Sequence, residues 1–300
     1  MKVMNRATTL ALASVPAAAG FAWRGYRKAA DALAAFPSSE PRLPGERREL
    51  TTRWGSVSYR MVDGDPGRPP LVLVHGWGKT GDSAWWPLMA KSDRTMVVVD
   101  LPGHGFSGLH GPFTFSIAAE AVERSIVDSG VESPVVVAHS MGGPVAMTAI
   151  RRGDPQLFSG MIAMASSAYW VRPRLKAMMA MAPYALAPGS PFLLHTQRAE
   201  LKELPELAPY LMWAYSRRPA PRILAESASE LRHFDARGWP DLFLPRTTWV
   251  VAADDGVLSP RHQRASAEQY ATTIVEVEAQ HSMVVQAPEK ALEIINDFTV

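Results

Sequence analysis

The sequence predicts an α/β protein whose mostly parallel sheet is covered by helices on both faces. Short apolar runs typical of buried strands alternate along the chain with longer helical patterns. Sheets of mostly parallel strands occur in proteins where helices cover both faces. With 300 residues, of which 47% are hydrophobic and 20% charged, the chain can bury one large core.

The strand and helix pattern begins near residue 48. Residues 48–62 predict two short antiparallel strands with their turn at Trp54–Gly55. Further buried strands are expected in four apolar runs, at 71–74, 95–100, 134–139 and 160–166. Helices are expected around Trp85 to Lys91, from about Ser116 to Asp128, and directly after Ser140.

Residues 167–243 interrupt this alternation with proline-punctuated helical segments that are rich in methionine and aromatic residues. Strands are expected again in 247–256 and 273–279, followed by a helix in 287–298. We therefore predict a helical lid inserted before the last two strands, although ordinary sheet-covering helices would give the same pattern. The predicted domains are a leader and linker at 1–46, a core at 47–166 and 244–300, and a lid at 167–243.

An uncharged segment, residues 7–23, lies between Lys2 and Arg6 on one side and further basic residues on the other. Its length is at the lower limit for spanning a bilayer, and it also resembles a signal peptide. We expect the protein to be membrane-associated or exported through this segment. The alternative is an alanine-rich helix packed on the protein, which would suit a cytoplasmic location.

Composition excludes several kinds of site. The chain has no cysteine, so disulfides, zinc–thiolate sites and cysteine nucleophiles are excluded. A net charge of +2 without a dense basic run argues against a nucleic-acid-binding protein. No phosphate-binding loop or dinucleotide-binding glycine pattern is present. We expect no cofactor, no metal ion and no nucleic-acid partner, while the oligomeric state stays open.

The stretch Ala138-His139-Ser140-Met141-Gly142 follows the pattern small-x-Ser-x-Gly at the end of a predicted strand. Small residues on both sides of a serine let a strand turn sharply into a helix and keep the hydroxyl exposed. The Met141 amide would then lie at a helix N-terminus, where it can donate to a developing oxyanion.

A serine hydroxyl needs a general base, usually a histidine oriented by a carboxylate. The strand within 247–256 ends in Asp254 and Asp255, and His281 follows the next strand. Serine, acid and histidine thus come in this order, each at the carboxyl end of a strand, where open parallel sheets bind their ligands. We expect these side chains to meet, with either aspartate as the acid.

These motifs resemble those of the α/β-hydrolase superfamily. The matching pieces are LVLVHGWG, VVDLPGHGFSG, VVVAHSMGG, VVAADDGVLSP and QHSMVVQAPEKALEIINDF, which fall in register over 47–166 and 244–300. The HSMGG stretch resembles the elbow of monoacylglycerol-lipase-like esterases and of some carbon–carbon bond hydrolases. Ala138 and Ala252 stand where the family usually has glycine, which leaves both turns feasible.

The resemblance implies a role for each matching residue. Ser140 would be the nucleophile, His281 the base and Asp255 the acid, since Ala252-x-x-Asp255 fits the family's spacing. The amides of Trp77 and Met141 would form the oxyanion hole. A serine at position 140 argues against the dehalogenase and epoxide-hydrolase branches, which attack through a carboxylate.

We expect structural roles for several other histidine and tryptophan residues. We expect His75 to make a structural hydrogen bond and His104 to shape its loop. His139 should point away from the nucleophile and take no part in the chemistry, and Trp85 and Trp86 should pack rather than bind.

The resulting prediction is a cofactor-independent serine hydrolase that cleaves carboxylic esters of hydrophobic acyl substrates through an acyl-enzyme. Met and aromatic side chains in the predicted lid would form adaptable apolar walls for such substrates. Two alternatives use the same triad, a carbon–carbon bond hydrolase and a perhydrolase or acyltransferase. A third is a ligand-binding protein on the same fold whose catalysis has lapsed.

Overall fold

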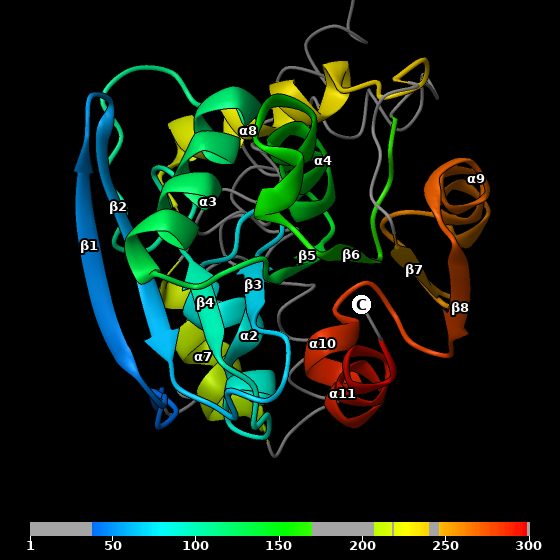
Figure 1. Ribbon diagram of the computed structural model, residues 1–300, viewed down its shortest axis with the longest axis horizontal. Coiled ribbons are helices and arrows are strands. Elements are labelled where there is room, and N and C mark those ends of the chain that lie inside the picture. Colours follow the sequence, from blue (N-terminus) through cyan, green and yellow to red (C-terminus); the bar gives the residue numbers. More distant parts are fainter. Residues whose placement is uncertain (1–37, 170–206, 218, 240–245, 299–300) are drawn as a thin grey trace, which may run out of the picture. The chain divides into compact units, whose positions relative to one another are not determined.

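The computed structural model describes residues 38–169, 207–217, 219–239 and 246–298 (Figure 1). The chain divides into two compact units, Met1–Glu40 with Pro183–Trp213, and Pro41–Ala182 with Ala214–Val300. In the first unit, the Ser39 amide donates to the Pro209 carbonyl at 3.1 Å. The second unit holds the sheet and the residues of the candidate active site.

An eight-stranded sheet forms the centre of the second unit, with the strand order β1-β2-β4-β3-β5-β6-β7-β8. The strands are β1 (Glu46–Thr52), β2 (Gly55–Val62), β3 (Leu71–Val74), β4 (Met96–Val99), β5 (Val135–His139), β6 (Gly160–Met164), β7 (Thr247–Ala252) and β8 (Thr273–Val277). The β1–β2 and β2–β4 pairs are antiparallel, and all the others are parallel. Each strand that the sequence predicts is present, and the turn between the first two contains Trp54, as expected.

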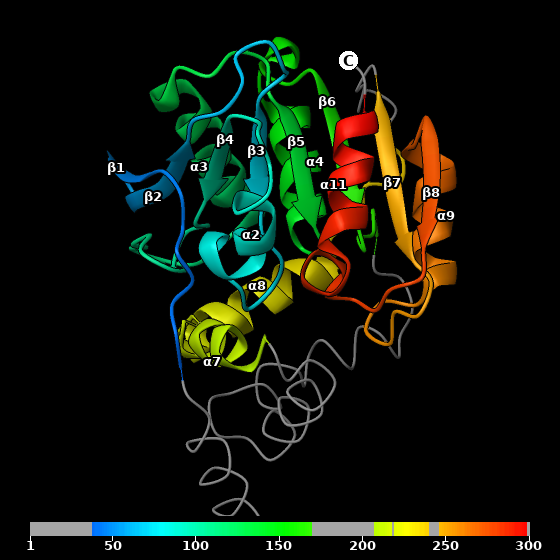
Figure 2. The ribbon, with the colours of Figure 1, turned by 90° about the horizontal axis from the view of Figure 1, so that it is seen from below.

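The helices are α2 (Gly81–Met89), α3 (Phe115–Ser129), α4 (Gly142–Arg152), a short 3-10 helix η1 (Pro155–Leu157), α7 (Ala208–Ser216), α8 (Pro221–His233), α9 (Pro260–Tyr270), α10 (Met283–Gln286) and α11 (Pro288–Asp297). Figure 1 shows α3 and α4 on one side of the sheet and α2, α10 and α11 on the other. Figure 2 shows β7 and β8 beyond β6 at one edge, with α9 next to β8.

Two hydrophobic cores lie on the two faces of the sheet, because successive side chains of a strand point in opposite directions. In β3, Val72 and Val74 join the core with α3, α4, α8 and α9. Leu71 and Leu73 join the core with α2, α10 and α11. All four side chains are at most 1% exposed, so the strand is buried on both faces, as predicted for a covered parallel sheet.

Capping residues fix where the helices begin. α3 starts after Thr114, whose hydroxyl accepts the Ile117 amide at 3.2 Å, and it ends at the left-handed Gly130. The helix expected around Trp85 to Lys91 begins earlier, at Gly81. Thr80 and Ser83 form a reciprocal capping box there, which the sequence reasoning did not consider.

The predicted insertion is helical where it is described, in α7 and α8. Its two ends are held together, since the Ala236 amide donates to the Ala168 carbonyl at 2.9 Å and Tyr169 forms an isolated bridge with Asp235. Residues 1–37, 170–206, 218 and 240–245 lie outside the described residues. The division into a leader at 1–46, a core at 47–166 and 244–300, and a lid at 167–243 stays a prediction.

No helix in the described ranges is long and apolar enough to cross a membrane. The segment 7–23, predicted to reach a membrane or to direct export, lies outside those ranges.

Candidate active site

Ser140 lies on a tight elbow between β5 and α4, with a left-handed φ of +52°. Two glycines make this elbow possible. A Cβ at Gly142 would lie 2.3 Å from the Val74 carbonyl oxygen, and one at Gly143 would lie 1.9 Å from Ser166 Oγ. Three hydrogen bonds hold the serine's backbone, Ser140 N–H to the Met164 carbonyl at 2.9 Å, Ser166 O–H to the Ser140 carbonyl at 2.8 Å and Gly143 N–H to the same carbonyl at 3.0 Å. Close packing therefore requires glycine at positions 142 and 143.

The three side chains predicted to form the site lie in hydrogen-bond contact. His281 Nε2 is 2.9 Å from Ser140 Oγ, and its Nδ1 is 2.7 Å from Asp255 Oδ2. The Asp255 side chain is fully buried, whereas that of His281 is 19% exposed. An imidazole placed in this way can accept the serine proton at Nε2 while the carboxylate stabilises the charge that it gains.

Of the two aspartates at the end of β7, only Asp255 contacts His281 in the described structure. Asp254 is exposed, and its amide donates to the Ala279 carbonyl at 3.0 Å. Asp255 Oδ1 accepts the amides of Val257 and Leu258, both at 2.8 Å. The loop after β7 thus turns the Asp255 carboxylate inward and the Asp254 side chain outward.

Sequence reasoning missed Gln263, a fully buried residue of α9 that fixes this carboxylate. Its Nε2 donates to Asp255 Oδ2 at 2.8 Å and to the Leu258 carbonyl at 2.7 Å, and its Oε1 accepts the Ala252 amide at 3.0 Å. No sequence signal identifies it, because it stands in the polar stretch PRHQRASAEQY, where a buried glutamine looks like its exposed neighbours.

The two predicted oxyanion donors lie on segments that touch. Met141 precedes the first residue of α4, and Trp77 follows β3 in a turn. A Cβ at Gly76 would lie 3.1 Å from Ser140 Cβ, so this turn packs directly against the elbow. Neither the Trp77 nor the Met141 amide has a hydrogen-bond acceptor among the described residues. Their role as oxyanion donors stays a prediction.

His75 makes the structural hydrogen bonds expected of it. It accepts the Leu101 amide at Nε2 (3.1 Å), so Nδ1 carries the proton and donates to the Gly76 carbonyl at 2.9 Å. Burial holds the pKa of His75 well below its ordinary value, which keeps the ring neutral.

His104 and the two tryptophans also have structural positions. The His104 ring lies 5.0 Å from the His75 ring, and its Nδ1 bonds the Pro102 carbonyl at 3.1 Å within the loop that it shapes. Trp85 is fully buried and Trp86 packs against the same core, as predicted.

His139, to which the sequence reasoning assigned no chemistry, contacts His281, the predicted base. Its Nε2 lies 2.7 Å from the His281 carbonyl oxygen, and the two rings are 5.1 Å apart. This contact could not be found from strand alternation, because it depends on how the loop after β8 folds back.

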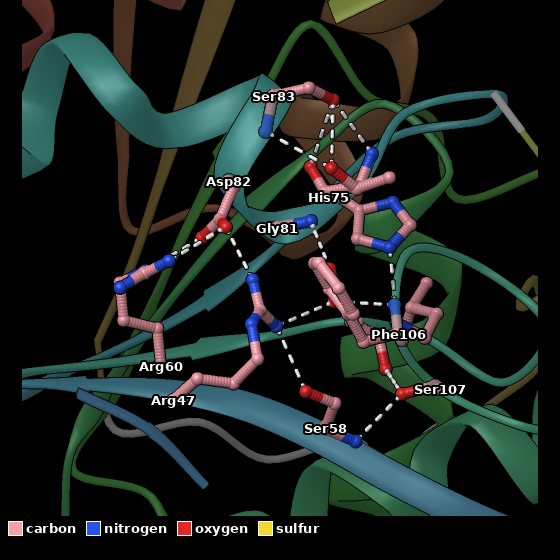
Figure 3. Close-up of polar contacts among 12 residues, drawn as sticks. Arg47, Ser58, Arg60, His75, Gly81, Asp82, Ser83, Phe106 and Ser107 are labelled. Atoms are coloured by element: carbon pink, nitrogen blue, oxygen red, sulfur yellow. Dashed lines mark hydrogen bonds and ion pairs between the residues drawn. The ribbon is translucent and has the colours of Figure 1, made fainter. Parts of the chain in front are cut away.

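Asp100, at the end of β4, ties together the segments that surround the site. Its carboxylate accepts the Gly81 amide at 2.7 Å and the Phe106 amide at 3.0 Å. Arg47 of β1 donates to the same carboxylate at 2.9 Å, and it also pairs with Asp82 (Figure 3). Burial raises the pKa of Asp100, and the nearby Arg47 charge opposes that rise.

This buried carboxylate joins the beginning of α2, just beyond the Trp77 turn, to the loop containing His104.

Among the described residues, no group of three or more histidine, aspartate or glutamate side chains could hold a metal ion.

A model of the Alpha/beta hydrolase family matches residues 71–294. The pimeloyl-[acyl-carrier protein] methyl ester esterase of Vibrio parahaemolyticus is 42% identical over 103 residues, which are 33% of this chain and 37% of that protein. The 2-succinyl-6-hydroxy-2,4-cyclohexadiene-1-carboxylate synthase of Escherichia coli is 35% identical over 92 residues, 30% of this chain and 36% of that protein.

The chain therefore spans little more than a third of the length of these curated relatives. Among solved structures, a thermophilic esterase from Thermogutta terrifontis has a TM-score of 0.71 at 20% identity, over 84% of this chain and 97% of that one. This likeness shows a shared fold. Because the family model covers well over half of the sequence, the chain belongs to the alpha/beta hydrolase family.

Proposed function

We propose that the protein is a serine hydrolase that cleaves carboxylic esters of hydrophobic acyl substrates. The observation that carries this proposal is the unbroken hydrogen-bond chain from Ser140 Oγ through the His281 ring to Asp255. The 42% identity to a protein named as a methyl ester esterase, over 103 residues, supports the same reaction class.

In the proposed reaction, Ser140 Oγ attacks the ester carbonyl carbon while His281 Nε2 takes the hydroxyl proton. The carbonyl π electrons move to the oxygen, and the Trp77 and Met141 amides stabilise the resulting oxyanion. When the tetrahedral intermediate collapses, the carbon–oxygen bond to the alcohol breaks and the alcohol leaves with the proton from His281. Water then attacks the acyl-enzyme with His281 again as base, which releases the acid and restores the serine.

The proposed substrate class depends on the predicted lid, 167–243, whose composition is rich in Met and aromatic residues. Support comes from α8, which lies against the loops next to the serine. The Trp77 indole donates to the Leu224 carbonyl at 3.0 Å, and Ile223 packs so closely on Gly103 that a Cβ there would lie 2.7 Å from it. We propose that this helix forms part of the wall of an acyl pocket.

The test is hydrolysis of p-nitrophenyl esters, from acetyl to palmitoyl, by the wild type and by Ser140→Ala. We expect the wild type to turn over the longer chains, and Ser140→Ala to lose up to about 10⁶-fold in kcat, as for other serine triads. Ser116→Ala, at an exposed serine of α3, is the matched control and should keep full activity.

Labelling of Ser140 by a fluorophosphonate separates the remaining outcomes. Labelling without turnover of any ester would favour a carbon–carbon bond hydrolase or an acyltransferase, and the 35% identity to the cyclohexadiene carboxylate synthase makes the first worth assaying. If Ser140 is not labelled and no ester is hydrolysed, the proposal is contradicted, and the result would indicate a binding protein.

A further inference from the structure

We propose that His139 is a positioning residue, which holds the segment carrying His281 against the nucleophile elbow. The inference rests on the proposed function, since it assigns a partner to the base of that same site.

The contact joins residues 142 positions apart in the chain. His139 directly precedes Ser140, and its Nε2 lies 2.7 Å from the His281 carbonyl oxygen. Because a carbonyl oxygen can only accept, Nε2 carries a proton and donates it. The residue next to the nucleophile is thus bonded to the backbone of the base itself.

The His139 ring is held tightly in this orientation. The side chain is 7% exposed, and a Cβ at Gly76 would lie 2.9 Å from its Nδ1. The ring therefore fills the space between the turn that carries Trp77 and the loop that carries His281.

His139 also stays uncharged beside a group that becomes charged during the reaction. Burial, and then the nearby His281, lower the pKa of His139 to about 3. Lys79 acts in the same direction, whereas Asp255 and the hydrogen bond to the His281 carbonyl oppose the shift, and His75 also lies close by. A neutral donor keeps its hydrogen bond throughout the working pH range without repelling the imidazolium that forms at His281.

Backbone hydrogen bonds anchor the loop on either side of the His281 carbonyl. The Ala279 carbonyl accepts the Asp254 amide at 3.0 Å, and the Ser282 carbonyl accepts the Val285 amide at 2.9 Å. Between these two points, the His281 carbonyl is held by His139. Loss of the donor should let the His281 ring drift from both Ser140 and Asp255, and misplacement by about 1 Å can cost about 100-fold in rate.

The experiment measures the second-order rate constant for phosphonylation of Ser140 by a fluorophosphonate between pH 5 and 9. His139→Phe keeps a ring of similar size without the donor, and His139→Gln restores an N–H. We expect labelling to slow by about 10- to 100-fold in His139→Phe and to recover most of the wild-type rate in His139→Gln. His110→Phe, at an exposed histidine, is the control.

The rate constant distinguishes positioning from general damage. If His281 drifts from Ser140 in His139→Phe, the rate constant itself should fall throughout pH 5 to 9 and recover in His139→Gln. If His139→Phe were only less stable, a smaller fraction of the protein would be labelled, but the rate constant for phosphonylation of Ser140 would be unchanged.

Wild-type labelling kinetics in His139→Phe, or equal slowing in the Phe and Gln variants, would overturn the inference. Wild-type protein that labels but hydrolyses no ester would refute the ester assignment and still leave this comparison decisive. Absence of labelling in the wild type would refute both.

Discussion

The side-chain amide of Gln263 fixes the position of the Asp255 carboxylate, which in turn contacts His281. It donates to the same oxygen of Asp255 that His281 Nδ1 contacts, and it also bonds the backbone at Ala252 and Leu258. A buried carboxylate that accepts several hydrogen bonds is held in one orientation. Gln263 therefore determines where the acid of the proposed triad can lie.

Replacement of Gln263 by methionine, which has a similar length but no N–H donor, should impair both stability and rate. It leaves the buried Ala252 amide without its acceptor, which costs about 1–3 kcal/mol in the free energy of unfolding. A displaced Asp255 should lower kcat by about 10-fold or more with little change in KM. Denaturant unfolding and ester kinetics check this, with Gln269→Met on the exposed face of α9 as the control. An unchanged kcat would show that Asp255 is held well enough by the Val257 and Leu258 amides.

The sequence could predict which residues meet in the site, but it could not predict what holds them. Ser140, Asp255 and His281 were found because each follows a strand of a parallel sheet, and those strand ends share one edge. Gln263 lies inside a helix and His139 at the end of a buried strand, so their roles depend on loop conformations that no local pattern encodes.

At the scale of elements, α8 is fastened to the core by two glutamates. Glu226 accepts the Phe113 amide and Glu230 the Phe115 amide, both at 2.8 Å. Phe115 is the first residue of α3, so the Glu230 charge also lies at the positive end of that helix. The same helix accepts the Trp77 indole, and its position should therefore affect the proposed oxyanion hole.

Glu230→Leu should consequently weaken catalysis from outside the site. It leaves the buried Phe115 amide unpaired, at a cost of about 1–3 kcal/mol in unfolding free energy, and loosens α8 against Trp77. Loss of a well-placed oxyanion donor costs about 10²–10³-fold in kcat, so a loosened one should cost less. Glu230→Gln keeps an acceptor and should lose only the charge contribution, about 0.3–1 kcal/mol. If both variants match the wild type in kcat, α8 does not influence the oxyanion donors.

The sequence predicted some helices and missed others, because some bury apolar side chains and others bury polar ones. α11 buries Ala291, Ile294 and Ile295, which stand at helical spacing. α9 received no prediction because it buries mainly polar or small side chains, including His262 and Gln263, so it lacks an apolar stripe. Such a helix is stabilised by specific hydrogen bonds, which a hydrophobic pattern does not reveal.

At the scale of the whole molecule, buried neutral histidines should make the fold sensitive to acid. Burial lowers the pKa of His104 from the ordinary 6.5 to about 4, and burial with His281 lowers that of His139 to about 3. Below pH 6.5 the unfolded chain therefore binds more protons than the folded one, and the free energy of unfolding falls as the pH drops. Glu123 acts oppositely, since burial raises its pKa to about 7.

His104→Asn isolates one of these contributions. Between about pH 4 and 6.5, the unfolding free energy should depend less steeply on pH in the variant than in the wild type. The difference in slope should reach up to about 1.4 kcal/mol per pH unit, which corresponds to one proton bound on unfolding. Above pH 7.5 the two curves should run parallel, because His104 is then neutral in both states. Urea unfolding at a series of pH values measures this, and parallel curves throughout would mean that His104 has the same pKa in the folded and the unfolded protein.

The separation of Ser140 from His281, its proposed base, has a consequence for biosynthesis. The two residues in hydrogen-bond contact lie 141 positions apart, and β7 and β8, which precede Asp255 and His281, lie at one edge of the sheet. At about 5–20 residues per second, a ribosome needs roughly 7 to 30 s to travel from the serine codon to the histidine codon. During that interval the nascent chain lacks His281, the proposed base. In the proposed mechanism, the serine therefore gains its reactivity only when the late strands join the sheet.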